Sequence, residues 1–346
     1  MDIFSYFTIA AEQHASDLHL IAGAPPVLRV DGVLKPLDGE KPLDPKVLQN
    51  AAYSQLLTPE QIKQFEYNWD LDFARTLPSV RLRINLRVQR EGLALSARLI
   101  PVTIPSAQDI ALPVALQDLA THHDGLVLVT GPSGCGKSTT LAVMLNTINA
   151  TRQSHIITIE DPIEFVYERN KSIIEQREVG SQVRSFGQAL KYALRQDPNV
   201  LLVGEMRDLE TMSATLTAAE TGHLVLSTLH TPNAVATLER VIDVFPPHQQ
   251  HQVRLQLASS LRAVIAQQLL PRRGGGVVVA REVLLVNAAV ANLIRENKIH
   301  QIISVMQTSG KLGMITMAKA VETLITQELL DAEDGMQHLR TLHTLS

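Results

Sequence analysis

The sequence has 346 residues, of which 45% are hydrophobic and 19% are charged, so the chain can bury a sizeable core and is not disordered as a whole. Its formal net charge is -4 and aromatic residues make up only 4%, which disfavours a protein that grips the phosphate backbone of nucleic acid or stacks its bases. A single cysteine, Cys135, excludes an intramolecular disulfide and a four-cysteine zinc site.

Nothing near the N-terminus has the pattern of a signal peptide, because the segment lacks a basic start and reaches Glu12 and Asp17 early. No apolar run approaches the roughly 20 residues that a membrane-spanning helix needs. We therefore expect a cytoplasmic protein.

The first third of the chain predicts a small α+β domain. Residues 1–23 predict a helix, with Phe4 and Phe7 at helical spacing, followed by the strand Asp17–Ile21. The elements expected next are hairpin strands at Val27–Val30 and Val33–Leu37, which turn at Asp31-Gly32, and a helix over Leu43–Phe65 with Thr58-Pro59-Glu60 as an N-cap and first turn.

Residues Val80–Gln89 alternate strictly between apolar and polar side chains, which predicts a strand with two unlike faces. Arg81 and Arg83 fall on the polar face. A turn at Glu91-Gly92 leads into a partner strand that ends at Arg98–Ile100. The pattern indicates an arginine-lined sheet face, and alternation alone also describes a face that is simply solvated.

Three prolines, Pro101, Pro105 and Pro113, mark a stretch with little periodicity. We therefore divide the chain into an N-terminal α+β domain at 1–104, a linker at 105–116 and a second domain at 117–346.

The second domain begins with four apolar strands separated by helical segments. Apolar runs without alternation suit a parallel sheet that is covered on both faces. The strands are expected at Leu126–Val129, Ile156–Ile159, Val200–Val203 and Leu224–Thr228. Beyond Pro246-Pro247 we expect helices at His248–Leu270, Ala288–Gln307 and Ile315–Leu330, and a strand at Val277–Val286 after Gly274–Gly276.

The segment GPSGCGKST fits the pattern of a phosphate-binding P-loop, and it lies between an apolar strand and a helix as that loop requires. Its backbone N–H groups would surround the phosphates of ATP, Lys137 would reach the β- and γ-phosphates, and Ser138 would bind Mg²⁺. The nucleotide-binding residues expected are Gly131, Pro132, Ser133, Gly134, Cys135, Gly136, Lys137, Ser138 and Thr139. Cys135 is either a reactive thiol or merely a small loop residue.

Polar residues follow the other three strands of the expected sheet. Because ligands bind beyond the carboxyl ends of parallel strands, these residues are candidates for the active site. They are Glu160, Asp161 and Glu164 after the first, Glu205 after the second and His230 after the third, with His223 at the start of that third strand.

Hydrolysis of ATP needs an acidic group for Mg²⁺ and a group that orients the attacking water. Glu205 is expected to hold Mg²⁺ together with Ser138. Glu164 or Glu160 would polarise the water, and His230 would sense the γ-phosphate. The alternative for each carboxylate is an ordinary solvated salt bridge.

Long ordered motifs resemble the PilT family, the type IV pilus retraction ATPases of the secretion ATPase superfamily. They are SDLHL, RLRIN, ARLIP, GPSGCGKSTT, ITIEDPIEF, QREVG, ALRQDPNVLLVGEMRDLET, ETGHLVLSTLHTPNAVATLERVIDVFP and ANLIRENKIHQIISVMQTSGKLGM. The resemblance covers nearly the whole chain. It implies an α/β protein in which a PAS-like N-terminal α+β domain precedes a RecA-like P-loop ATPase domain with a helical C-terminal part.

The same resemblance implies roles for further residues. It makes Gly131–Ser138 the Walker A motif, Ile159–Phe165 an Asp box, Val200–Glu205 the Walker B motif and Thr221–Thr231 a His box. In such motors the N-terminal domain covers the nucleotide. Arg81, Arg83 and Arg98 are then candidates for contacting the phosphates, since a donated arginine stabilises transition-state charge.

The function that the resemblance implies is a homohexameric motor that hydrolyses ATP to retract a pilus. Its partners would be an inner-membrane platform protein and related pilus ATPases, with membrane contact only through them and nucleic acid unlikely. Alternatives are an accessory retraction, secretion or DNA-uptake ATPase, a nucleotide-binding regulatory subunit with little turnover, and a RecA-like DNA translocase, which the acidic charge balance disfavours.

Overall fold

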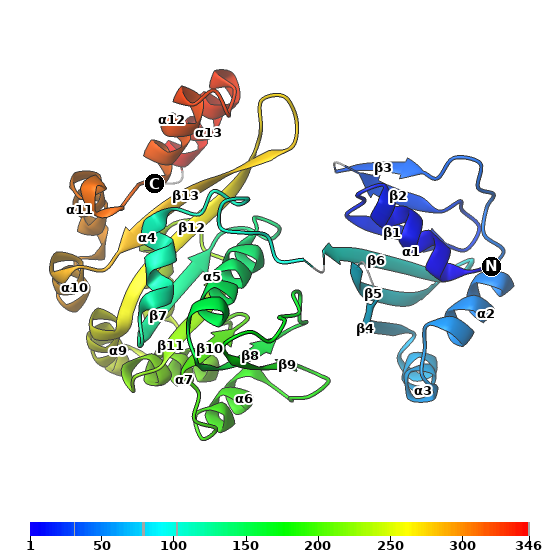
Figure 1. Ribbon diagram of the computed structural model, residues 1–346, viewed down its shortest axis with the longest axis horizontal. Helices are drawn as coiled ribbons and strands as arrows, with labels where there is room; N and C mark the ends of the chain where they lie inside the picture. The colour runs from blue at the N-terminus through cyan, green and yellow to red at the C-terminus, as the bar shows by residue number, and fades with distance from the viewer. Residues whose placement is uncertain (31, 78–79, 102, 345–346) are drawn as a thin grey trace. The chain divides into compact units, whose positions relative to one another are not determined.

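The computed structural model describes residues 1–30, 32–77, 80–101 and 103–344 (Figure 1). The described residues divide into two compact units, one of residues 1–103 with Glu164–Val166 and one of residues 104–163 with 167–346. Each unit contains helices and a sheet, so the α/β fold class is confirmed. The hairpin turn expected at Asp31-Gly32 lies partly outside the described residues, since Asp31 is not among them.

Within its described residues, the first unit contains a six-stranded antiparallel sheet with the order β3-β2-β1-β6-β5-β4. Its strands are β1 (Asp17–Ile21), β2 (Val27–Val30), β3 (Val33–Pro36), β4 (Asp70–Thr76), β5 (Val80–Gln89) and β6 (Gly92–Pro101). Its helices are α1 (Ile3–Glu12), α2 (Pro45–Gln55) and α3 (Pro59–Asn68). The helix expected over Leu43–Phe65 is therefore two helices, and a capping box between Thr58 and Gln61 starts the second.

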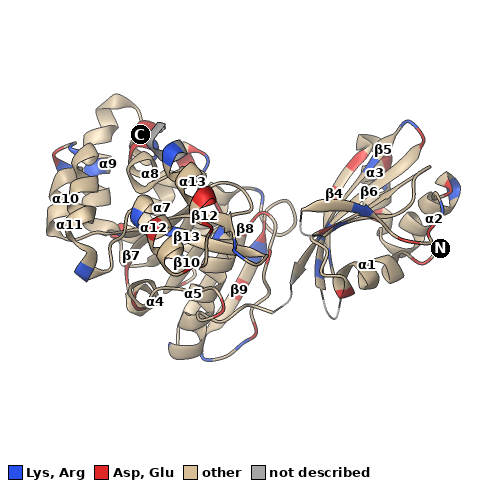
Figure 2. Ribbon diagram, turned by 90° about the horizontal axis from the view of Figure 1, so that it is seen from above, with Lys and Arg blue, Asp and Glu red and all other residues tan. Residues whose placement is uncertain are grey.

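The two faces of this sheet follow the alternation of β5. Leu82, Ile84 and Leu86 are fully buried and share one core with Phe7 of α1 and Leu48 of α2. The helices therefore cover one face, and the intervening polar residues line the other. Figure 2 shows basic residues on the strands of this sheet, as the arginine-lined face requires.

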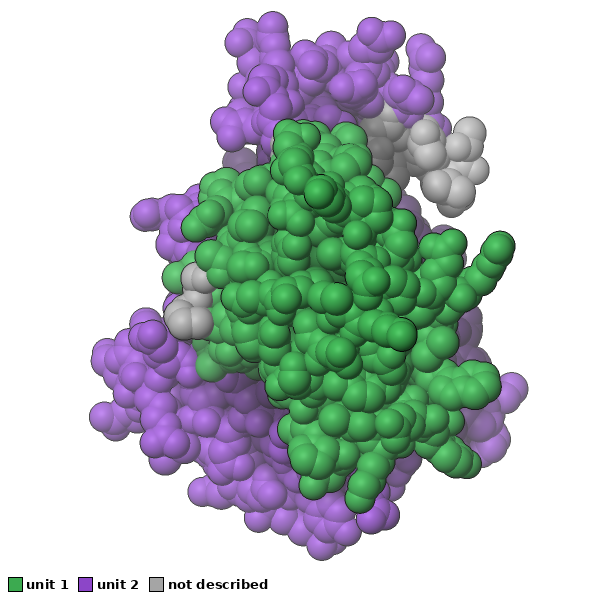
Figure 3. Space-filling view, turned by 90° about the vertical axis from the view of Figure 1, so that its right-hand side faces the viewer, with its two compact units in different colours: residues 1–103, 164–166 green, residues 104–163, 167–346 purple. Residues whose placement is uncertain are grey.

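The described part of the second unit contains a seven-stranded sheet with the order β13-β12-β7-β11-β10-β8-β9, and the unit is purple in Figure 3. The strands are β7 (Gly125–Thr130), β8 (His155–Glu160), β9 (Ile173–Glu178), β10 (Val200–Val203), β11 (Leu224–Leu229), β12 (Leu261–Pro271) and β13 (Val277–Leu285). All neighbours are parallel except β12 and β13, which form an antiparallel pair. The four apolar strands expected from the sequence are confirmed as β7, β8, β10 and β11.

Helices cover both faces of this sheet. Leu126 and Leu128 of β7 belong to a core that also contains buried residues of the helices from α6 to α10. Val127 and Val129 are equally buried but point to the other face, where α5 packs against β7 and β11. The helices are α4 (Val114–Asp118), α5 (Lys137–Thr151), α6 (Phe186–Ala193), α7 (Leu209–Glu220), α8 (Ala234–Asp243), α9 (Pro247–Ser260), α10 (Ala288–Arg295), α11 (Ile302–Thr308), α12 (Met317–Thr326) and α13 (Ala332–Thr344).

The expected helix over His248–Leu270 is wrong in its second half. Helix α9 ends at Ser260, and the chain continues directly as β12. This strand lies between β7 and β13 and is mostly buried, so its side chains do not alternate in polarity. A short apolar run of this kind cannot be assigned to helix or strand from periodicity alone.

Two other expected helices differ from the structure in their bounds, and further elements were not expected. The helix expected over Ala288–Gln307 is interrupted near Asn297, which has a positive φ of 59°. The helix expected at Ile315–Leu330 is confirmed as α12, with tighter bounds. The strands β4 and β9 and the helix α13 were not expected. Within the described residues, no helix has the length and hydrophobicity that a bilayer span requires.

The segment expected to be a linker is partly ordered by a buried arginine. Arg281 on β13 donates from its guanidinium to the carbonyl oxygens of Ile110 and Ala111, at 2.9 and 3.0 Å. Burial lowers the pKa of Arg281 to about 10. Helix α4 then begins at Val114, inside the range expected to be a linker.

The neighbouring residue of β13, Glu282, joins two helices through its carboxylate. One oxygen accepts from the N–H of Ala234 at the start of α8 (2.7 Å), and the other accepts from the N–H of Met317 at the start of α12 (3.1 Å). Burial raises the pKa of Glu282, although these two donors act in the opposite direction. A carboxylate at a helix N-terminus satisfies N–H groups that lack partners within the helix.

We expect Glu282→Ala to destabilise the second unit by about 2 to 4 kcal/mol, because an N–H group at the start of each of two helices loses its acceptor and a cavity is left. Urea unfolding, followed by the loss of helical circular dichroism, measures this change. The control is Glu322→Ala, which removes an exposed glutamate on α12 and should change stability by less than about 0.5 kcal/mol.

Candidate active site

The P-loop leaves the end of β7 and leads into α5. Gly131, Gly134 and Gly136 have φ values of 134°, 78° and 85°, which other residues adopt only at a cost. At Gly131 there is also no space, since a Cβ would collide with the main-chain oxygen of Gln267. The strand, loop and helix thus follow one another as the GPSGCGKST pattern requires.

Lys137 lies at the first position of α5 with only 8% of its surface exposed. Its ammonium donates to the carbonyl oxygens of Gly131 and Pro132, at 2.8 and 2.9 Å. The same Nζ lies 3.5 Å from Nδ1 of His230, which follows β11. The lysine therefore reaches across the loop toward the end of the neighbouring strand.

His230 connects this lysine to Glu205, which follows β10. Nε2 of His230 lies 3.6 Å from Oε2 of Glu205, and the same oxygen forms an ion pair with Nε of Arg207 at 2.7 Å. Because β7, β10 and β11 are parallel, their carboxyl ends meet at one edge of the sheet. Three residues from distant parts of the sequence are brought together there.

Glu160 lies at the end of β8, one strand beyond β10. It is 8% exposed, and its Oε1 accepts from Oγ1 of Thr158 at 2.6 Å and from Nε2 of Gln176 at 3.3 Å. Main-chain atoms of Glu160 lie close to Gly204, where an added Cβ would come within 3.3 Å of the Glu160 Cα. The carboxylate is thus already engaged inside the sheet.

Glu164 lies in the loop after β8 and is half-buried. Glu164 belongs to the first compact unit, whereas Glu160 belongs to the second. Within the described ranges, the hydrogen bonds and ion pairs around the P-loop do not include Glu164. Asp161 is exposed in the same loop.

The remaining loop residues differ in exposure. Ser138 and Thr139 are half-buried in the first turn of α5, and Pro132, Ser133 and Gly134 are exposed. Cys135 is buried, and that burial raises its pKa against the opposing effect of Lys137. A reactive thiol needs the opposite shift, so the structure favours Cys135 as a small loop residue.

His223 does not belong to this site. It lies at the amino end of β11, where its carbonyl oxygen accepts from the N–H of Gly125 at 3.0 Å. Its Nδ1 lies 3.0 Å from the carbonyl oxygen of Ala218. Since β7 and β11 are parallel, His223 is at the opposite edge of the sheet from the P-loop. The structure therefore does not bring it together with Lys137, Glu205 and His230.

Gln267 is a residue of this region that the sequence interpretation missed. Its Nε2 donates to the carbonyl oxygen of Cys135 at 2.7 Å, and its Oε1 accepts from Oγ1 of Thr140 at 3.0 Å. The sequence feature that could have indicated this residue is a pair of glutamines, Gln267-Gln268, inside an apolar run. This feature was not interpreted because β12 was expected to be helical.

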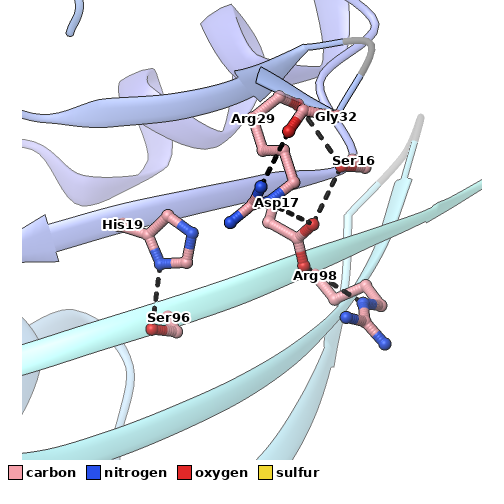
Figure 4. A network of polar contacts seen from close by, with 7 residues as sticks. All are labelled: Ser16, Asp17, His19, Arg29, Gly32, Ser96 and Arg98. Carbon is pink, nitrogen blue, oxygen red and sulfur yellow. Dashed lines mark hydrogen bonds and ion pairs between the residues drawn. The ribbon is translucent and has the colours of Figure 1, made fainter. Parts of the chain in front are cut away.

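The arginine-lined face lies in the first unit, and Figure 4 shows part of it. Asp17 on β1 is placed between Arg98 and Arg29, with N–O distances of 3.1 and 3.8 Å. His19, two residues further along β1, lies 3.1 Å from Oγ of Ser96 through its Nδ1. Burial lowers the pKa of His19 and nearby arginines add to the effect, whereas Asp17 opposes it.

The other candidate arginines lie on β5. Arg81 donates to Oγ1 of Thr76 at 3.2 Å, and Arg83 is exposed and directly opposite Arg98 in the pairing of β5 with β6. Arg83 and Arg98 are therefore neighbouring like charges, of which Arg98 has Asp17 as a partner. Such a face can attract an anion, and it can equally be solvated.

Comparison with known proteins gives a consistent result. The family model described as type II/IV secretion system protein matches residues 70–340. The type IV pilus retraction ATPase PilT of Pseudomonas aeruginosa is 44% identical over 97% of this chain and 98% of its own length. The type IV pilus ATPase PilU of the same organism is 37% identical over 100% of this chain and 90% of its own length.

Among solved structures, the pilus retraction motor PilT with bound ADP superimposes with a TM-score of 0.90 at 46% identity, covering 97% of this chain and 96% of that one. The ATPase DotB of Legionella pneumophila superimposes with a TM-score of 0.87 at 27% identity, covering 99% and 96%. With its P-loop and with similarity over nearly its whole length, this chain belongs to the PilT family of ATPases among the type II/IV secretion system proteins.

Proposed function

We propose that this chain is a motor ATPase that hydrolyses ATP to retract a type IV pilus. The observation that carries the proposal is the convergence of Lys137, His230 and Glu205 at the P-loop. Similarity over nearly the full length to a protein named as a pilus retraction ATPase supports the biological task.

The P-loop would bind the phosphates of ATP through its backbone N–H groups and the N-terminus of α5. In the structure, the Lys137 ammonium is bonded to two carbonyl oxygens of the loop itself. These bonds hold the ammonium against the main chain of the loop. On binding, Lys137 would exchange them for bonds to the β- and γ-phosphate oxygens.

Ser138 and Glu205 would hold Mg²⁺ together with the phosphates. A hydroxyl and a carboxylate are the hard oxygen donors that this ion prefers, and it commonly keeps water and phosphate oxygens in its other positions. Within the described ranges, no three His, Cys, Asp or Glu side chains are grouped so that they could hold a metal ion by themselves. Bound there, Mg²⁺ would neutralise charge on the phosphates.

The attacking water would be oriented by a carboxylate of the segment after β8. Glu160 is bonded to Thr158 and Gln176, which suits a positioning role in the sheet. Glu164 lies in the loop after β8 and is the other candidate. His230, between Lys137 and Glu205, would sense the γ-phosphate, because both of its ring nitrogens face charged partners.

Arg81, Arg83 and Arg98 would supply positive charge to the nucleotide from the first unit. Arg83 is the strongest candidate, because it is exposed and repelled by the neighbouring Arg98. An anion bound there would relieve that repulsion. We assign residues 1–104 to the N-terminal α+β domain, 105–116 to the linker and 117–346 to the ATPase domain.

The working form would be a homohexamer. It would act with an inner-membrane pilus platform protein and with related pilus ATPases at the cytoplasmic side of the membrane. Closing of the N-terminal domain on ATP and opening after hydrolysis would supply the stroke.

Expression in a piliated bacterium that lacks its own retraction ATPases tests the proposal. We expect the chain to restore twitching motility, and Lys137→Ala to fail at an equal protein level. Two outcomes would contradict a main retraction motor. If motility returns only beside a resident retraction ATPase, the chain is an accessory subunit. If the purified chain binds ATP without hydrolysing it, the chain is a regulatory one.

A further inference from the structure

Gln267 lies at the base of the P-loop. Strand β12 runs parallel to β7, with Ala266 opposite Thr130, so Gln267 comes level with the residue at which the loop begins. It is 1% exposed, and Ile265 and Ala266 before it are fully buried and apolar. An uncharged polar side chain at such a position needs partners for both ends of its amide.

Both ends of that amide are used on the nucleotide loop and its helix. Nε2 donates to the carbonyl oxygen of Cys135 (2.7 Å), and Oε1 accepts from Oγ1 of Thr140 on α5 (3.0 Å). At the other end of the loop, the main-chain oxygen of Gln267 lies so close to Gly131 that a Cβ there would collide with it. One residue thus contacts the start of the loop, its end and the following helix.

The bond to Cys135 has a directional consequence. A trans peptide is planar, and its C=O and N–H point in opposite directions. If the Cys135 oxygen is held toward Gln267, the N–H of Gly136 must point away from it. Backbone N–H groups of this loop are the donors that bind phosphate. The direction of one such donor is therefore set by the amide of Gln267.

We propose that Gln267 is a positioning residue of the ATPase site, which orients the Cys135–Gly136 peptide so that the Gly136 N–H faces the bound phosphate. The inference rests on the proposed binding of nucleotide at the P-loop. If the inference is correct, Gln267 contributes to the affinity for nucleotide. Its simpler alternative is a glutamine whose bonds only stabilise the fold.

Two substitutions separate the bonds. Gln267→Leu removes both, whereas Gln267→Glu, assayed at a pH high enough to ionise the new carboxyl, keeps an acceptor for Thr140 and removes the donor to the Cys135 oxygen. The matched control is Gln268→Leu, on the same strand and half-buried, whose side chain points to the opposite face. The measurements are the Kd of MgADP by titration calorimetry, the KM and kcat of ATP hydrolysis, and the melting temperature without nucleotide.

We expect both Gln267 variants to raise the Kd of MgADP and the KM for ATP by about tenfold. This is the usual effect of losing one hydrogen bond to a ligand, here the bond from the Gly136 N–H to phosphate. Gln268→Leu should bind as the wild type does. If Gln267→Leu fails to fold, Gln267→Glu decides the matter alone.

If Gln267→Glu has the Kd and KM of the wild type, the inference is overturned and the proposed function stays intact. This holds also if the melting temperature of the variant falls, because the role of Gln267 is then purely structural. Failure of the wild-type chain to bind MgADP would instead remove the proposed function together with this inference.

Discussion

Replacing Lys137 by alanine should abolish measurable ATP hydrolysis, with a fall in kcat of at least about a hundredfold. The side chain is buried at the first turn of α5, and its ammonium is bonded to Gly131 and Pro132 of the loop that would receive the phosphates. Without it, the developing charge on the γ-phosphate would lose a cation that neutralises it. Phosphate release by the purified protein measures the effect, with nucleotide binding followed by titration calorimetry.

The control for this variant is Lys191→Ala. Lys191 is an exposed lysine on α6 that pairs with Glu210 on the surface. Its loss should leave kcat within about twofold, because an exposed ion pair contributes little. Hydrolysis by Lys137→Ala at the rate of this control would contradict the assignment of the P-loop.

Glu205→Gln should separate binding from hydrolysis. The substitution keeps the size and hydrogen-bonding reach of the side chain but removes the charge that would hold Mg²⁺ and its waters. We expect MgADP to bind within about tenfold of wild type, and kcat to fall by about a hundredfold or more. Single-turnover hydrolysis of labelled ATP, compared with equilibrium binding by the same preparation, distinguishes the two effects.

Glu210→Gln serves as the matched control, since Glu210 is an exposed glutamate near the start of α7. It should hydrolyse ATP as the wild type does. A Glu205→Gln protein with the turnover of Glu210→Gln would show that another carboxylate, such as Glu160, has the role that we assign to Glu205.

The nucleotide site was largely predictable because its parts have local signatures. The P-loop is defined by residue type and spacing, and the strands before Glu205 and His230 are apolar runs that end in polar residues. The rule that parallel strands present their carboxyl ends at one edge then placed them together. His223 was correctly predicted to precede its strand, and for that reason it lies at the opposite edge of the sheet.

The contribution of β12 could not be predicted in the same way. Its sequence, LRAVIAQQLLP, follows helix α9 without a turn residue and is mostly buried, so neither a break nor an alternation marks the change. Gln267 therefore appeared as a helix residue. Its contact with the P-loop depends on the pairing of β12 with β7, which is a tertiary property.

The arginine-lined face shows a different limit. Alternation in Val80–Gln89 correctly predicted which residues share a face, because the period of a strand is fixed at two. It could not predict that Asp17 joins Arg29 and Arg98, since these residues come from three strands. The alternation also does not predict a ligand, because a solvated face and an anion-binding face have the same alternation of apolar and polar residues.

A crystal structure of this protein with Mg²⁺ and a non-hydrolysable ATP analogue is the most direct test. We predict that the β-phosphate contacts the amides of residues 131–138, that Lys137 has moved from the loop carbonyls to the phosphates, and that the metal lies between Ser138 and Glu205. A triphosphate bound at any other place, or a metal coordinated away from Glu205, would contradict the account.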